Sequence, residues 1–99
     1  MASAGDQPLV NGTYVGTGSA LSIDTVGFKA KYIRFVNETT GAEAEYSDTM
    51  GDDEVRTSDS GTDAFATSGG VTLTDTGFDL GTNAVVNTSA DVVHWVAWA

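Results

Sequence analysis

Few side chains in this sequence could support catalysis. His94 is the only histidine among the 99 residues, and cysteine is absent. Catalysis needs a nucleophile, a base and a preorganised electrostatic site. The sequence has no Gly-x-Ser-x-Gly elbow and no glycine-rich phosphate loop opening a helix. Because His94 lies in an apolar segment beside Trp95, we interpret it as a packed or interface residue. The sequence therefore predicts a protein that is not an enzyme and that uses no cofactor.

An acidic segment over residues 48–54 is the one candidate for a metal site. It contains Asp48, Asp52, Asp53 and Glu54. Calcium takes about six to eight oxygen ligands, and its common loop supplies them with the spacing Asp-x-Asp-x-Asp-Gly. The spacing here differs from that loop. We interpret the segment as a solvated acidic turn, with an irregular cation site as the alternative, and we predict no metal.

The charge of the chain argues against several classes of partner. Fourteen Asp and Glu against four Lys and Arg give a formal net charge of −10. Such a surface repels the phosphates of nucleic acids and anionic membranes. The acidic, lysine-poor composition fits either a protein from a salt-rich setting or an ordinary acidic protein kept soluble by its charge. We predict that the chain binds neither nucleic acid nor membrane.

Two further features bear on where the chain acts. No segment approaches the ~20 apolar residues of a membrane span. The first residues also lack the basic and apolar regions of a secretion signal. We therefore expect the chain to be made in the cytoplasm.

Short alternating segments predict the fold. Apolar and polar residues alternate in runs that recur about every eight to twelve residues between Gly, Asn, Asp and Ser clusters, which is typical of a β-sandwich or barrel. We predict an all-β chain with a flexible N-terminal arm over 1–10 and a single small antiparallel β-sandwich or barrel-like domain over 11–99. The strands are expected at 13–15, 20–24, 31–37, 42–46, 54–57, 62–67, 71–75, 82–87 and 91–98.

The clearest hairpin joins residues 31–37 to residues 42–46. Ile33 and Phe35 share the face expected to lie in the core, and Glu43 and Glu45 are expected to point outward. Two turns are also predicted. The first is a hairpin-type turn at Asn11-Gly12, and the second is at Ser68-Gly69-Gly70, after a strand that Phe65 anchors.

The last strand is apolar on both faces, which is typical of a strand buried on both faces. Part of that burial could come from another chain. Trp95 is expected in the core, whereas Trp98 points to the opposite face and is either a core or an interface residue. Residues 24–28 and 75–78 echo each other, which suggests two equivalent corners or a chance match.

The order of several short motifs resembles a small virion-protein module of tailed phages. The resemblance covers about residues 20–99, with Ala30 at a position where that pattern often has proline. The motifs that carry it are Gly27-Phe28-Lys29-Ala30-Lys31-Tyr32-Ile33, Val36-Asn37, Met50-Gly51-Asp52, Ala66-Thr67-Ser68-Gly69-Gly70-Val71, Gly77-Phe78-Asp79-Leu80-Gly81, Val86-Asn87 and His94-Trp95-Val96-Ala97.

The resemblance implies a structural virion protein on the capsid exterior. It would be a capsid decoration (cement) protein that binds the major capsid protein, as a homo-trimer, and the composition would suit a virus of a salt-loving, archaeal host. The residues expected to bind the partner are Leu9, Val10, Tyr14 and Trp98. The alternative is a carbohydrate- or receptor-binding or structural module of a tail or fibre, in which Trp98, Tyr32 or Tyr46 would stack on sugar rings.

Overall fold

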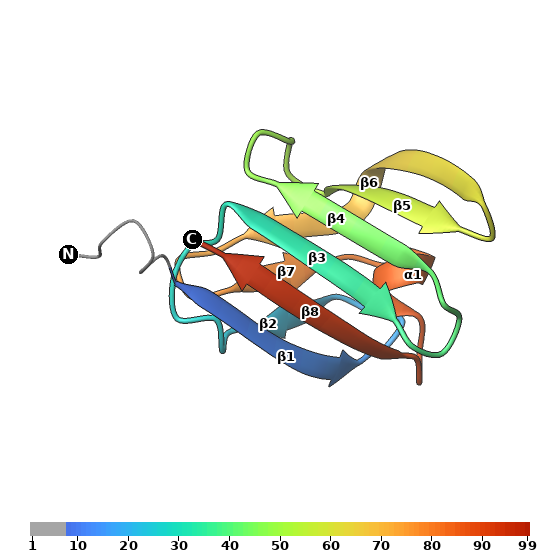
Figure 1. Ribbon diagram of the computed structural model, residues 1–99, viewed down its shortest axis with the longest axis horizontal. Coiled ribbons are helices and arrows are strands. Elements are labelled where there is room, and N and C mark those ends of the chain that lie inside the picture. Colours follow the sequence, from blue (N-terminus) through green and yellow to red (C-terminus); the bar gives the residue numbers. More distant parts are fainter. Residues whose placement is uncertain (1–7) are drawn as a thin grey trace.

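Residues 8–99 form one eight-stranded antiparallel sheet that curls over on itself. Figure 1 shows the computed structural model, which describes residues 8–99. The strands follow the order β1-β8-β3-β4-β5-β6-β7-β2 across the sheet. The elements are β1 (Leu9–Val15), β2 (Leu21–Ile23), β3 (Tyr32–Asn37), β4 (Glu43–Ser47), β5 (Glu54–Asp59), β6 (Thr62–Leu73), β7 (Phe78–Leu80), α1 (Ala84–Asn87) and β8 (Val92–Trp98).

The curled sheet makes two layers with the core between them. Strands β1, β8, β3 and β4 form the layer nearer the viewer in Figure 1, and β7 and β2 lie behind it. Phe78 of β7 meets Phe35 of β3 and Trp95 of β8 edge-to-face, with ring centroids 5.6 and 5.5 Å apart. The predicted antiparallel β-sandwich or barrel-like class is confirmed, and so is the position of Trp95 in the core.

Alternation along the strands places the core residues. Ile33 and Phe35 are buried, as are Ala44 and Tyr46 opposite them in β4. The side chains of Arg34 and Glu43 point to solvent. The hairpin predicted from residues 31–37 and 42–46 is therefore confirmed, because the side-chain period of two suits one buried face and one wet face.

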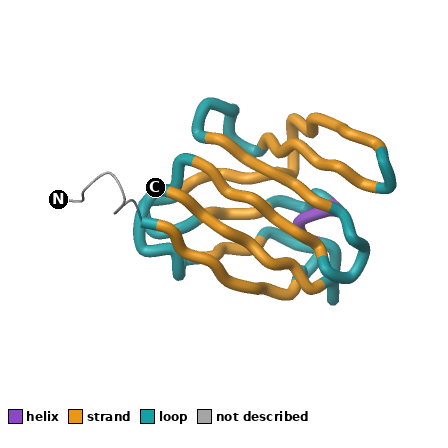
Figure 2. Tube along the Cα trace, viewed as in Figure 1, coloured by secondary structure: helices purple, strands orange, loops and turns teal. Residues whose placement is uncertain are grey.

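Strand β6 passes from one layer to the other through a bulge (Figure 2). Val55 pairs with Ala66, but Glu54 pairs with Val71, so residues 67–70 have no partner in β5. A Cβ on Gly70 would lie 2.4 Å from the Glu54 carbonyl oxygen, so only glycine fits this close approach. The turn predicted at residues 68–70 is therefore wrong: the segment is a bulge that bends one long strand.

The N-terminal predictions need two corrections. Strand β1 begins at Leu9, so the boundary of the predicted arm at residue 10 is two residues too late, and residues 1–7 lie outside the described part of the chain. Asn11 and Gly12 lie inside β1 and form no turn. Gly12 is needed there because Trp95 occupies the space of a side chain.

Two predictions in the second half of the chain are also wrong. The strand expected at 82–87 is instead the short helix α1, which Asn83 caps by accepting a hydrogen bond from the Val85 N–H at 3.0 Å. The side chain of Phe65 is exposed rather than anchored in the core. Strand β8 has one buried face, whereas Val92, Val96 and Trp98 on its other face are half-buried in the single chain, so burial of that face by another chain stays a prediction. Within residues 8–99 no helix is long and apolar enough to cross a membrane.

Two buried asparagines fasten loops to the core. The Asn87 side chain accepts a hydrogen bond from the Thr17 N–H (2.8 Å) and donates to the carbonyl oxygens of Ser19 (2.6 Å) and Gly81 (2.8 Å). The Asn37 amide donates to the Val85 carbonyl at 2.9 Å. Both side chains satisfy backbone groups that would otherwise be buried without a partner.

The two echoing segments lie side by side in the second layer. Ile23 pairs with Phe78 where β2 meets β7. Beyond this pair, the Gly27 N–H donates to the Thr76 carbonyl oxygen at 3.0 Å. Gly77 lies so close to Ile23 that an added Cβ would touch its carbonyl oxygen. The repeated Gly-Phe pattern therefore marks two corners that pack on each other.

Candidate interaction surface

The strand register gathers one set of side chains on the solvent side of the larger layer. We call this set the outer face. Across it, Trp98 lies between Leu9 and Tyr32, and Arg34 lies between Val96 and Glu45. The outer face consists of Leu9, Asn11, Thr13, Val15, Tyr32, Arg34, Val36, Glu43, Glu45, Ser47, Arg56, Ser58, Asp63, Phe65, Val92, His94, Val96 and Trp98.

Exposed apolar side chains concentrate on the outer face. Four large hydrophobic residues are exposed within residues 8–99: Leu9 (52%), Val15 (55%), Val36 (39%) and Phe65 (56%). All four belong to the outer face, and Val92, Val96 and Trp98 beside them are only half-buried. Single exposed hydrophobic residues are common, whereas a set that shares one face marks a contact surface.

The outer face carries only a small part of the negative charge of a very acidic chain. Two arginines (Arg34 and Arg56) against four carboxylates (Glu43, Glu45, Asp63 and Glu38 beside His94) leave a formal charge of 2 − 4 = −2, compared with −10 for the whole chain. A partner would therefore meet little of the repulsion that the rest of the surface produces.

The charged residues in the middle of the outer face are paired with each other. Arg34 pairs with Glu43, and Arg56 donates to both Glu45 and Asp63 at 3.1 Å. These side chains are substantially exposed, so each pair is worth only about 0–1 kcal/mol. They link the side chains of neighbouring strands across the sheet.

One corner of the outer face carries an aromatic pair. The rings of Tyr32 and Trp98 lie 5.2 Å apart at a tilt of 47°. The Tyr32 hydroxyl donates to Glu45 at 2.5 Å. Burial raises the pKa of Tyr32, and the hydrogen bond to Glu45 and the charge of that carboxylate raise it further. Leu9, opposite Trp98, extends this corner to the edge of the sheet.

The outer face also assembles a hydroxyl, an imidazole and a carboxylate. The Thr13 hydroxyl and the Nδ1 atom of His94 are 2.9 Å apart, and Nε2 of His94 lies 2.7 Å from Glu38. Nucleophile–base pairs of enzymes show the same order of groups. Here both His94 and Glu38 are about half exposed or more, on an open sheet surface. The contacts hold the histidine ring in place on the outer face.

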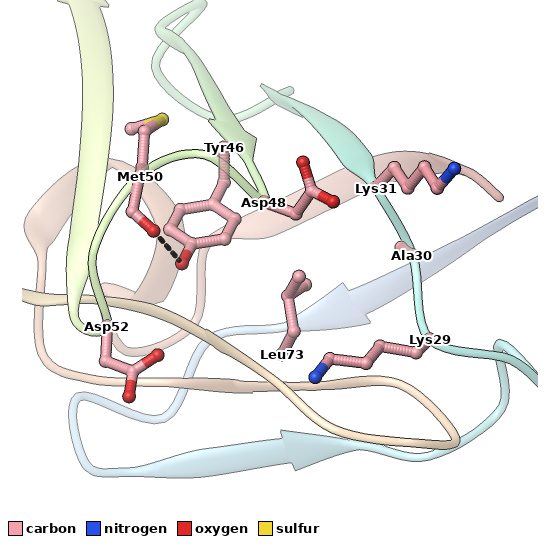
Figure 3. A pocket seen from close by; sticks show the side chains of 8 residues that line it. All are labelled: Lys29, Ala30, Lys31, Tyr46, Asp48, Met50, Asp52 and Leu73. Carbon is pink, nitrogen blue, oxygen red and sulfur yellow. Dashed lines mark hydrogen bonds between the residues drawn. The ribbon is translucent and has the colours of Figure 1, made fainter.

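A pocket of about 370 Å³ opens elsewhere, at the end of the sandwich (Figure 3). Ala30, Met50 and Leu73 give it an apolar lining. Figure 3 shows the Lys29 ammonium and the Asp52 carboxylate on opposite sides of Leu73. Lys31 and Asp48 stand at its rim, so the pocket carries both lysines of the chain.

The acidic segment lies beside this pocket. Within residues 8–99 no three Asp, Glu, His or Cys residues are grouped as metal ligands would be. Two of its carboxylates make hydrogen bonds: Glu54 accepts from the Gly51 N–H within the segment at 2.9 Å, and Asp53 accepts from the Thr72 hydroxyl of β6 at 3.2 Å. These bonds shape the turn from residue 51 to residue 54.

The four residues predicted to bind a partner have different positions. Leu9 and Trp98 are neighbours on the outer face. Val10 packs against the core. Tyr14 is buried, and its hydroxyl donates to the Val86 carbonyl oxygen at 2.5 Å, so its assignment as a contact residue is wrong. The reason is strand alternation, which turns Tyr14 inward when Thr13 and Val15 point outward.

Tyr46 is also unsuited to the role proposed for it on sugar rings. It is almost fully buried, and its hydroxyl donates to the carbonyl oxygens of Met50 and Gly51 at 3.1 and 3.0 Å.

The sequence did not identify Val15, Val36 and Phe65 as residues of the candidate interaction surface. The alternation around Val36 was visible in the sequence, whereas the exposure of Phe65 depends on how far the β5–β6 hairpin extends from the core.

Comparisons of this chain with protein-family models, with curated proteins and with solved structures give no match.

Proposed function

We propose that this chain is a structural virion protein that decorates a capsid, and that it attaches to the major capsid protein through the outer face. The observation that carries the proposal is the shared position of Leu9, Val15, Val36 and Phe65, which are exposed on the same side of one sheet. Burial of such side chains drives protein association. The resemblance of residues 20–99 to small virion proteins supplies the nature of the partner.

The chemistry of the outer face suits a clamp across a seam between shell subunits. Apolar side chains at its edges would be covered by the partner, and the arginine–carboxylate pairs at its centre would form a polar contact region. Cementing needs no chemical step, only buried area. The added area would resist outward pressure on the shell by linking subunits that otherwise touch weakly.

Binding to assembled shells tests this proposal. The purified chain is mixed with shells of the major capsid protein of the virus that encodes it, and bound copies are counted after sedimentation. We expect saturable binding at a fixed ratio to shell subunits and a higher temperature of shell disruption. Phe65→Ser and Val36→Asp should each weaken binding at least tenfold without unfolding the chain. Unchanged binding of both variants would contradict attachment through the outer face.

A second candidate function is carbohydrate or receptor binding by a tail or fibre module. The observation that favours it is the pocket of Figure 3, whose apolar lining carries an ammonium and a carboxylate on opposite sides. Sugars bind to such mixtures of apolar surface and placed polar groups. Titration of the isolated chain with the polysaccharide of the host surface would support it if Lys29→Ala abolished binding and Phe65→Ser did not.

A further inference from the structure

Strand β1 leaves one edge of the sheet open. Among residues 8–99 it pairs with β8 alone, and it stands at one end of the strand order. At its two ends the Gly16 N–H donates to the Asp91 carbonyl (2.8 Å) and the Ala99 N–H donates to the Pro8 carbonyl (3.1 Å). Hydrogen-bonded pairs alternate along an antiparallel ladder, so every second residue of β1 bonds to β8. The remaining residues turn their backbone groups to the open edge: Leu9, Asn11, Thr13 and Val15.

This edge lacks the features that prevent edge strands of soluble proteins from pairing with another chain. Such edges usually carry lysine, proline, an inward charge or a bulge, or they are very short. The seven residues of β1 include no charged residue and no proline, and their register with β8 is unbroken. The strand at the other edge, β2, is different, because it has only three residues. It also has a charged group beside it, since the Ser22 hydroxyl donates to the Asp79 carboxylate of β7. The contrast indicates that the β1 edge has an occupant.

The sequence of β1 is complementary to itself about Gly12. If two copies pair antiparallel with a twofold axis at this glycine, Leu9 lies opposite Val15 of the second copy, and Asn11 lies opposite Thr13 of the second copy. Every residue with outward backbone groups then falls in a hydrogen-bonded pair, which gives up to about eight backbone hydrogen bonds. No other register about this strand uses all four residues.

The same register covers the exposed apolar side chains of the edge. Leu9 and Val15 are 52% and 55% exposed in the single chain and lie on the outer face. Twofold pairing places each against the other across the new ladder, at the short distance of a cross-strand pair. The two polar residues between them also face each other. At the axis, Gly12 contributes no side chain, and its inner side is already filled by Trp95.

We propose that this chain forms a twofold dimer by antiparallel pairing of β1 with β1 of a second copy, so that two outer faces join into one continuous surface. None of the β1 residues carries a charge at neutral pH. Repulsion between two chains of charge −10 acts at longer range and is screened by salt. Dimerisation should therefore strengthen from low to molar salt. The proposal goes beyond capsid binding and does not depend on it.

Cysteine cross-linking of the full chain tests the register, since the chain has no cysteine of its own. Asn11→Cys chains are mixed with Thr13→Cys chains and oxidised. The two positions face each other in the proposed ladder, where Cα atoms are about 5.5 Å apart and a disulfide can form. Each variant alone is the matched control, because identical positions lie on a diagonal of about 7–8 Å. We expect rapid cross-linking of the mixture only.

Sedimentation equilibrium in molar salt gives the mass. We expect the mass of two chains for the parent protein. Asn11→Pro removes an outward N–H but no hydrogen bond to β8, so its mass should fall to that of one chain. The control variant Asn11→Thr should keep the mass of two chains. If Asn11→Pro fails to fold, Val15→Glu provides the same test, because its side chain is exposed in the single chain. One chain at about 1 mM protein, three chains as the resemblance implies, or equal cross-linking in all mixtures would overturn the dimer. The shell-binding variants Phe65→Ser and Val36→Asp leave β1 intact, so the two proposals fail separately.

Discussion

Gly12 of β1 and Trp95 of β8 lie opposite each other, and the indole ring of Trp95 fills the space above the glycine. A Cβ built on Gly12 would come within 2.6 Å of Cζ2 and 2.9 Å of Cε2 of this ring. Trp95 in turn meets Phe78 of the second layer edge-to-face. A single contact between two neighbouring strands therefore decides how deeply the central aromatic residue enters the core.

The first prediction concerns this contact. Gly12→Ala should lower the free energy of unfolding by about 1–3 kcal/mol, because the added methyl group displaces a ring that is fixed on all sides. Chemical denaturation monitored by tryptophan fluorescence measures the effect. Gly51→Ala is the control, since a Cβ there meets the Glu54 carboxyl only at an ordinary 3.4 Å. Equal effects of the two variants would contradict the packing role of Gly12.

The second prediction concerns the buried amide of Asn87. Asn87→Ala should cost about 2–4 kcal/mol, because it leaves the Thr17 N–H and the carbonyl oxygens of Ser19 and Gly81 without their partner. Hydrogen exchange should accelerate most at the Thr17 amide. Asn83→Ala removes a single capping bond to Val85 and should cost about 1 kcal/mol. A uniform rise in exchange across the chain would argue against a local role for Asn87.

The third prediction is a loss of stability in alkali. Burial raises the pKa of Tyr14, and burial together with nearby carboxylates raises the pKa values of Tyr32 and Tyr46. The folded chain therefore favours neutral tyrosine. This contribution to the free energy of unfolding is complete below about pH 10, the pKa of free tyrosine, and is lost as pH rises through the higher pKa values of the folded state.

Denaturation across the alkaline range, followed with tyrosinate absorbance, measures this decline. Tyr14→Phe loses the hydrogen bond to the Val86 carbonyl and should be less stable by about 1 kcal/mol at neutral pH. Its stability should fall less steeply in alkali, because the phenylalanine cannot ionise. A slope as steep as that of the parent chain would assign the decline to other groups.

The fourth prediction is stabilisation by salt. Fourteen carboxylates against four cations repel one another in the compact state, and at 1 M salt the Debye length falls to about 3 Å. The melting temperature should rise from low to molar sodium chloride. The double variant Asp52→Asn with Asp75→Asn changes the charge from −10 to −8 at two exposed sites and should show a smaller rise. A flat or falling melting temperature in the parent chain would contradict net repulsion as the cause.

The local alternation of residue types was enough to predict much of the fold. It indicated an antiparallel β chain, the hairpin of β3 and β4, and the inward positions of Ile33 and Phe35. A side chain on a strand points to the face opposite that of its neighbour, so a short stretch of sequence already records which face is buried. The core position of Trp95 agrees with the same rule, whereas Leu9 was expected in a flexible arm and its outward position on β1 was not predicted by alternation.

Tyr14 and residues 68–70 show where this rule is insufficient. Whether a glycine-rich segment turns the chain or bulges within one strand depends on the partner strand, which here shifts register between Glu54 and Val55. Tyr14 was assigned to the surface because the local sequence did not reveal that β1 starts at Leu9 and pairs with β8 along its whole length.

The sequence by itself therefore determined the all-β fold class, the acidity of the chain and the inner face of its clearest strands, because composition and a two-residue period are local properties. Only the tertiary structure decided which strands are neighbours, which edge stays open, and that Leu9, Val15, Val36 and Phe65 share one surface. These features depend on pairing between residues far apart in the chain, such as Leu9 with Trp98. Which residues pair is set by which face of each strand is buried, and that is decided only when the whole sheet has folded.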